Sequence, residues 1–254
     1  FEYNNISSLE KLLISDKKIG AIKMEVIRNE NPKNNFLQKV KKLSQKYNKV
    51  LIFDECTTGF RETLGGIYKK FNVEPDILIL GKALGNGYPI SCVIGKEEIM
   101  KLKKKSFISS TFWTDRIGPV AALETINIME KQKTWQKITK IGNKIRNFWS
   151  VISNRHNLPI EIYGIPSLTN YSFKDDENNL LFRSYLINNL LSKNYLSSNI
   201  FYSSISHTDK ILKKYFEYLD EGFYEMKKSI DNESIFKLRK NLKNLRIFRK
   251  WKSR

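Results

Sequence analysis

The chain has 254 residues, which is enough for one or two domains with a sizeable core. Its hydrophobic content of 41% is typical of a globular protein and excludes a disordered chain. No apolar run reaches the roughly 18 residues that a membrane-spanning helix needs. The net charge of +19 is spread along the sequence, so we interpret it as solvated surface charge and do not expect a nucleic-acid partner.

The cysteines and histidines are too few and too scattered for a metal site. Cys56, Cys92, His156 and His207 show no ligand spacing, so we expect no structural metal. Two free thiols indicate a reducing compartment, which predicts a cytoplasmic protein. Because the chain starts at Phe1, we expect it to be part of a longer protein.

The first half of the chain alternates between helical and strand patterns. Apolar residues at helical spacing predict helices over 7–18 and 34–48. Apolar runs bounded by charged or turn residues predict strands over 19–27, 49–55, 76–80 and 91–95. Strands that alternate with helices favour an α/β fold with a mainly parallel sheet.

The second half of the chain is mostly helical. One long helical pattern runs from about residue 118 to 152, with Val120, Leu123 and Met129 on one face. The segment from residue 157 predicts a smaller α+β unit with helices over 186–196 and 209–230, the latter with Leu212, Tyr215, Phe216 and Leu219 facing inward. We therefore predict a large domain over 1–155, a small C-terminal domain over 156–232 and a basic tail over 233–254.

The tail is the one concentrated basic segment. Nine basic residues and no acidic residue occupy 237–254, with apolar residues between them. The pattern fits a basic amphipathic helix on an acidic surface and fits a solvated tail equally well.

An aspartate and a lysine stand at the ends of two predicted strands. Asp54 ends the run VLIFD, and Lys82 follows the run DILIL, 28 residues after Asp54. This separation suits one crossover between parallel strands, and open α/β sheets bind ligands at the carboxyl ends of their strands. Taken singly, Lys82 could be a surface lysine and Asp54 a turn residue or helix cap. Together they favour a shared site.

This pair of side chains suits pyridoxal phosphate. A lysine amine can form a Schiff base with an aldehyde, and a buried carboxylate can keep a pyridine nitrogen protonated. The same lysine can then move a proton as general acid and base.

Three segments in order resemble the class III pyridoxal-phosphate aminotransferases of fold type I, in the glutamate-1-semialdehyde aminomutase-like branch. They are LIFDECTTGFRETLGG, VEPDILILGKALGNGYPIS and SSTFWTDRIGPVAALETI, and weaker similarity extends to about residue 230. The resemblance implies that the chain holds the C-terminal part of a fold type I large domain and a small α+β domain.

The resemblance also implies roles for four residues. Lys82 corresponds to the lysine that forms the Schiff base, and Asp54 to the partner of the pyridinium nitrogen. Cys56 stands where the family usually packs Val or Ile on the ring face. Thr111 matches the threonine that reaches the cofactor phosphate of the partner subunit in a homodimer with shared active sites.

The resemblance leaves the reaction open. It implies a transaminase that moves an amino group between a small amino donor and a keto or aldehyde acceptor, or an aminomutase that moves it within one molecule. Family members bind the phosphate with a loop upstream of the matched segments, so we expect this chain alone to bind the cofactor weakly or not at all. A third alternative is a catalytically silent fragment that acts as a basic binding protein.

Overall fold

The computed structural model describes residues 1–236 except 28, 102–106, 108, 110 and 113. Most of the predicted basic tail therefore lies outside the described residues. The chain divides into two compact units, Phe1–Lys140 and Ile141–Arg254. This division falls within helix α5 (Thr134–Arg155), whereas the proposed domain boundary at residue 155 coincides with the end of that helix.

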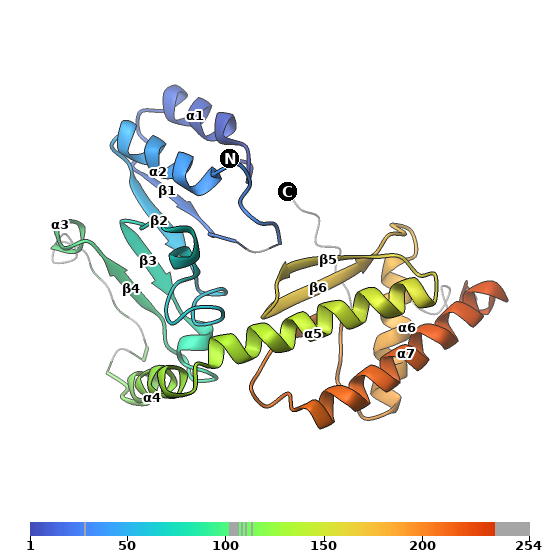
Figure 1. The fold of residues 1–254 in the computed structure, drawn as a ribbon. Coiled ribbons are helices and arrows are strands. Elements are labelled where there is room, and N and C mark those ends of the chain that lie inside the picture. The colour runs from blue at the N-terminus through green and yellow to red at the C-terminus, as the bar shows by residue number, and fades with distance from the viewer. Residues whose placement is uncertain (28, 102–106, 108, 110, 113, 237–254) are drawn as a thin grey trace. The chain divides into compact units, whose positions relative to one another are not determined.

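A four-stranded sheet forms the centre of the first unit. Its strands are β1 (Ala21–Met24), β2 (Val50–Asp54), β3 (Ile77–Leu80) and β4 (Cys92–Gly95), in the order β1-β2-β3-β4. The first three are parallel and β4 is antiparallel, as Figure 1 shows. The predicted α/β fold with a mainly parallel sheet is thus confirmed, with β4 as an antiparallel edge.

The two faces of this sheet differ in burial. Residues of β1–β3 alternate between buried and more exposed positions along each strand. Helices α1 (Ile6–Ser15) and α2 (Phe36–Lys46) contribute buried apolar side chains, among them Leu13, Leu37 and Val40. Lys23 and Asp54 belong to the less buried set, so they occupy one face of the sheet.

The long helical pattern predicted over 118–152 is two helices in the structure. Helix α4 spans Ile117–Gln132 and α5 begins at Thr134. Lys133 between them adopts a left-handed conformation with φ of 51°, which ends α4. Of the predicted face of α4, Met129 is buried, while Val120 and Leu123 are 63% and 64% exposed.

Among the described residues, the second unit contains three strands together with helices. Strands β5 (Ile160–Ile165), β6 (Leu168–Phe173) and β7 (Ile200–Tyr202) form an antiparallel sheet in that order. Helices α6 (Asn179–Ser192) and α7 (Asp209–Asp231) join the part of α5 after Lys140 around one core. The predicted smaller α+β composition is confirmed for the described residues.

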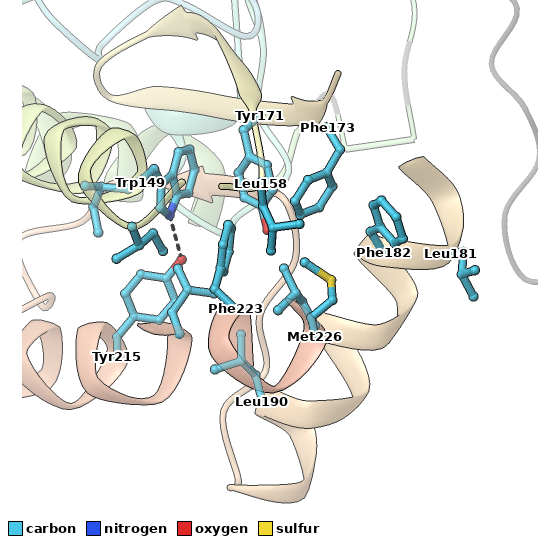
Figure 2. Packing of buried hydrophobic residues seen from close by; sticks show 14 of the residues in the cluster. Trp149, Leu158, Tyr171, Phe173, Leu181, Phe182, Leu190, Tyr215, Phe223 and Met226 are labelled. Carbon is cyan, nitrogen blue, oxygen red and sulfur yellow. Dashed lines mark hydrogen bonds between the residues drawn. The ribbon is translucent and has the colours of Figure 1, made fainter. Parts of the chain in front are cut away.

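Aromatic side chains fill the core of the second unit. Figure 2 shows Trp149, Tyr171, Phe173 and Phe223 packed together, and Trp149 Nε1 donates a hydrogen bond to the Tyr215 hydroxyl at 3.1 Å. This bond gives the buried indole NH of Trp149 a hydrogen-bond partner. The inward face predicted for α7 is confirmed at Leu212, Tyr215 and Leu219, while Phe216 is only half-buried.

No helix in the described part of the chain has the length and apolar character that a membrane crossing requires.

A short 3-10 helix, η1 (Ile67–Phe71), follows the loop after β2, and another, η2 (Lys82–Leu84), follows β3.

Candidate active site

Asp54 and Lys82 follow neighbouring parallel strands. Asp54 is the last residue of β2 and pairs in register with Ile79 of β3. The backbone NH of Glu55 donates to the Ile79 carbonyl at 2.8 Å, which continues the pairing one residue further. Lys82 comes two residues after β3. The structure therefore brings both residues to the same carboxyl-terminal edge of the sheet.

Lys82 adopts an unusual backbone conformation. Its φ of 45° lies in the left-handed region, which costs a non-glycine residue about 1 kcal/mol. The NH groups of Gly85 and Asn86 both donate to the Lys82 carbonyl at 3.1 Å and hold this turn. The exposed Nζ of Lys82 donates to Thr57 Oγ1 at 2.6 Å. The amine is thus directed toward the loop after β2.

Two glycines shape the loop after Lys82. A Cβ on Gly85 would lie 2.2 Å from the Tyr88 carbonyl oxygen, so only glycine permits this close approach. Gly87 has a φ of 111°, which favours glycine as well. The loop lines an open cavity of about 420 Å³, to which Lys82, Tyr88 and Arg61 contribute.

Both carboxylate oxygens of Asp54 accept hydrogen bonds. Oδ2 lies 3.0 Å from Lys23 Nζ of β1, and Oδ1 accepts from the Cys56 backbone NH at 3.2 Å. Partial burial alone would raise the pKa of Asp54, but the hydrogen bonds from Lys23 and Cys56 and the charge of Lys23 outweigh it and lower the pKa. Asp54 is therefore ionised at neutral pH.

Cys56 lies between the two strand ends. Burial, followed by the charge of Asp54, raises the pKa of its thiol, so the side chain is neutral at pH 7. Its Sγ is 3.4 Å from where a Cβ on Gly81 would lie. Cys56 is therefore a small, half-buried side chain beside Gly81, and its neutral thiol donates a hydrogen bond to the Asp54 carboxylate.

Glu55 fixes the loop that carries Cys56 and Thr57. Its side chain is completely buried and accepts hydrogen bonds from the backbone NH groups of Ile67 and Tyr68, the latter at 2.9 Å. These are the first two NH groups of η1, which have no partner within the helix. Burial raises the pKa of Glu55 although these bonds oppose the rise. Glu55 therefore fastens η1 to the end of β2.

Thr111 is exposed at a turn and is not among the described residues that line the cavity by Lys82. Its neighbour Ser110 lies outside the described residues. The predicted contact of Thr111 with a cofactor phosphate thus stays a prediction.

The sequence prediction missed two residues that the structure adds to the site. Thr57 accepts a hydrogen bond from Lys82, and Lys23 pairs with Asp54. Lys23 had a detectable signal, because a lysine inside the apolar run AIKM breaks the apolar pattern of a predicted strand. Thr57 had no such signal in the sequence, since its contact with Lys82 depends on how the loop folds.

The family profile "Aminotransferase class-III" matches residues 3–194. The chain belongs to the class III aminotransferases. This match includes both strand ends of the candidate site and confirms the predicted family.

Curated relatives include both kinds of enzyme in the predicted branch. The 3-aminobutyryl-CoA aminotransferase of Cloacimonas acidaminovorans is 34% identical over 245 residues, which cover 91% of this chain and 58% of that protein. The glutamate-1-semialdehyde 2,1-aminomutase of Sulfolobus acidocaldarius is 38% identical over 150 residues, covering 57% of this chain and 36% of that protein. The chain thus spans little more than half the length of the first relative.

Solved structures of the same fold type cover most of the chain. The acetylornithine aminotransferase of Elizabethkingia anophelis has a TM-score of 0.77 and 27% identity, over 89% of this chain and 59% of that one. The FumI protein of Sphingopyxis sp. MTA144 was solved in its PLP internal aldimine form. It has a TM-score of 0.85 and 22% identity, over 91% of this chain and 58% of that one. The predicted fold type I architecture is confirmed.

The side chains at the candidate site fit two ends of pyridoxal phosphate. The exposed Lys82 amine beside an open cavity suits the aldehyde, and the ionised Asp54 carboxylate suits a protonated ring nitrogen.

Proposed function

We propose that the protein containing this chain is a pyridoxal-phosphate-dependent aminotransferase. It would move an amino group from a small amino donor to a keto or aldehyde acceptor. The observation that carries this proposal is the placement of Lys82 and Asp54 after adjacent parallel strands, with Asp54 paired to Ile79. Membership in the class III aminotransferases supports it.

In this proposal each site residue has a distinct task. When bound, pyridoxal phosphate supplies an electron sink for the substrate's α-carbon. Lys82 would hold the cofactor through its Nζ, and its amine would act as the proton acceptor and donor at that α-carbon. The Asp54 carboxylate would hold the ring nitrogen, Cys56 would pack beside the ring, and Thr111 would bind the phosphate of the cofactor in the partner subunit.

We further propose a cytoplasmic homodimer. The exposed apolar side chains of α4, Ile117, Val120 and Leu123, are 58–64% exposed and suit burial against a second copy. Two thiols without a disulfide suit a reducing compartment.

An aminomutase is the second candidate, favoured by the 38% identity to the Sulfolobus acidocaldarius enzyme. The aminotransferase relative is 34% identical over 91% of the chain, whereas the aminomutase relatives that match 86% of the chain are 25–26% identical. The higher identity over this wide span makes intermolecular transfer the leading proposal.

Transfer of a ¹⁵N label distinguishes the two reactions. The full-length protein is incubated with ¹⁵N-labelled amino donors and a panel of carbonyl acceptors, and the products are identified by mass spectrometry. A transaminase places ¹⁵N on the acceptor. An aminomutase instead returns an isomer of its substrate without an acceptor. Absence of both products, or equal products from a Lys82→Ala variant, contradicts the proposal.

A further inference from the structure

Lys23 is a second lysine at the candidate site, and it does not contact the first. It lies on β1, and its Nζ approaches Asp54 Oδ2 at 3.0 Å. Lys82 Nζ instead donates to Thr57 Oγ1. The two amines thus have separate partners, and the carboxylate expected to hold the cofactor's ring nitrogen already holds a protein cation.

The sheet register places Lys23 beside Asp54. In the parallel pair β1–β2, Lys23 is opposite Ile52, and Asp54 is two residues further along β2 on the same face. This diagonal spacing is within reach of a long side chain. Lys23 is 58% exposed and the Asp54 side chain 27% exposed, so the pair faces the open side of this sheet.

We propose that Lys23 is a positioning residue that shares the Asp54 carboxylate with the ring nitrogen of the cofactor and weakens the hold of Asp54 on that nitrogen's proton. The inference rests on the proposed function. A carboxylate that already neutralises one cation attracts a second less strongly, and the Lys23 ammonium itself repels a pyridinium charge. Lys23 would therefore limit how readily the ring accepts electrons.

The other groups around the pair do not replace Lys23. The NH and the thiol of Cys56 also donate hydrogen bonds to Asp54, but the thiol is neutral at pH 7, so neither brings a positive charge to the carboxylate. Glu25, after β1, acts on Lys23 by its charge and helps keep it protonated. Burial raises and Lys23 lowers the pKa of Asp54, with a net lowering, which agrees with this coupling.

The first test measures Asp54 directly, without cofactor. The carboxyl carbon of Asp54 is titrated by ¹³C NMR in the 254-residue chain and in Lys23→Met, which removes the charge but keeps an unbranched side chain. We expect the Asp54 midpoint to rise in Lys23→Met by about one pH unit and to stay low in Lys23→Arg. Lys46→Met is the matched control, since Lys46 is 62% exposed and pairs with Glu10 at 2.8 Å. An unchanged midpoint in Lys23→Met overturns the inference.

The second test measures the ring nitrogen. In the full-length protein, ring-¹⁵N pyridoxal phosphate is fixed on Lys82 by borohydride reduction, and its nitrogen is titrated by NMR. In Lys23→Met the nitrogen should keep its proton to a pH about one unit higher than in the unchanged chain or in Lys46→Met. Equal midpoints in all three overturn the inference. Failure to label Lys82 contradicts the proposed function instead, and the Asp54 titration still decides whether Lys23 controls that carboxylate.

Discussion

Lys82 is held at the edge of the sheet by its backbone and by one side-chain contact. The left-handed backbone and the bond to Thr57 Oγ1 together direct its amine toward the loop after β2. Strain of this kind persists only where surrounding structure imposes it, and it is frequent at active sites. The hydrogen bonds to the Lys82 carbonyl supply that constraint.

Thr57→Val should weaken the orientation of Lys82 without unfolding the chain. The substitution removes the hydroxyl but keeps the branched shape. One hydrogen bond contributes about 0.5–1.5 kcal/mol, so we expect a two- to tenfold lower rate of pyridoxal phosphate attachment at Lys82, measured by borohydride trapping. Thr57→Ser should restore the rate. An unchanged rate in Thr57→Val would show that this hydroxyl does not position the amine.

The sequence predicts Lys82 and Asp54 better than it predicts their partners. The two residues end apolar runs, and strand ends in parallel sheets meet at one edge. Thr57 and Glu55 act through a loop whose path depends on Gly59, where a Cβ would lie 2.7 Å from the Glu55 carbonyl oxygen. Such close approaches leave no periodic pattern in a sequence.

Asp76 joins three elements of the first unit. Its Oδ1 lies 2.9 Å from Lys41 Nζ of α2 and 2.7 Å from Lys96 Nζ, which precedes α3 (Glu97–Met100). Its Oδ2 accepts from the Leu51 NH of β2 at 2.8 Å. This carboxylate therefore fixes the start of β3 against a helix and a neighbouring strand.

The chain should lose this contribution of Asp76 in acid. Burial raises the pKa of Asp76, but hydrogen bonds from Lys96, Leu51 and Lys41 outweigh it and lower the pKa from 3.8 to about 2. Because the pKa of Asp76 is lower in the folded chain than in the unfolded chain, the ionised carboxylate stabilises the fold above pH 3.8. This stabilisation declines as pH falls toward 2. Asp76→Asn should lower the free energy of unfolding at pH 7 and flatten its decline below pH 4, measured by urea unfolding. Parallel pH profiles for the two chains would contradict this role.

Element boundaries departed from the sequence prediction at α6, which spans Asn179–Ser192 where a helix over 186–196 was expected, and at Lys133, which separates α4 from α5. Helical periodicity continues across residues 118–152, so the sequence gives no sign of a break. The break depends on a lysine in a left-handed conformation, which sequence propensity does not predict.

At the scale of the whole molecule, the family match runs through both compact units. The first unit supplies Lys82 and Asp54, and the second has its own aromatic core. The antiparallel strands β5–β7 were not predicted individually. Residues along β5 and β6 do not alternate strictly between buried and exposed positions, and β7 has three residues.

Gly142→Ala tests the packing of the second unit. Alanine normally stabilises a helix relative to glycine, but a Cβ here would lie 1.8 Å from the Pro166 carbonyl oxygen. We expect a loss of about 3 kcal/mol in the free energy of unfolding, measured with denaturant. Gly20→Ala is the matched control, since no atom lies within 4 Å of its Cβ position, and it should change stability by less than about 0.5 kcal/mol. Equal effects of the two substitutions would contradict the close approach.

Covalent trapping on Lys82 tests the central claim most directly. The full-length protein is incubated with excess pyridoxal phosphate and reduced with borohydride, and the modified lysines are mapped by mass spectrometry. Trapping detects even weak binding, because each Schiff base that forms is made permanent. We predict a higher modified fraction at Lys82 than at any other lysine, and a lower fraction at Lys82 in Asp54→Ala. Modification of Lys82 no greater than that of an exposed lysine such as Lys46 would contradict the assignment.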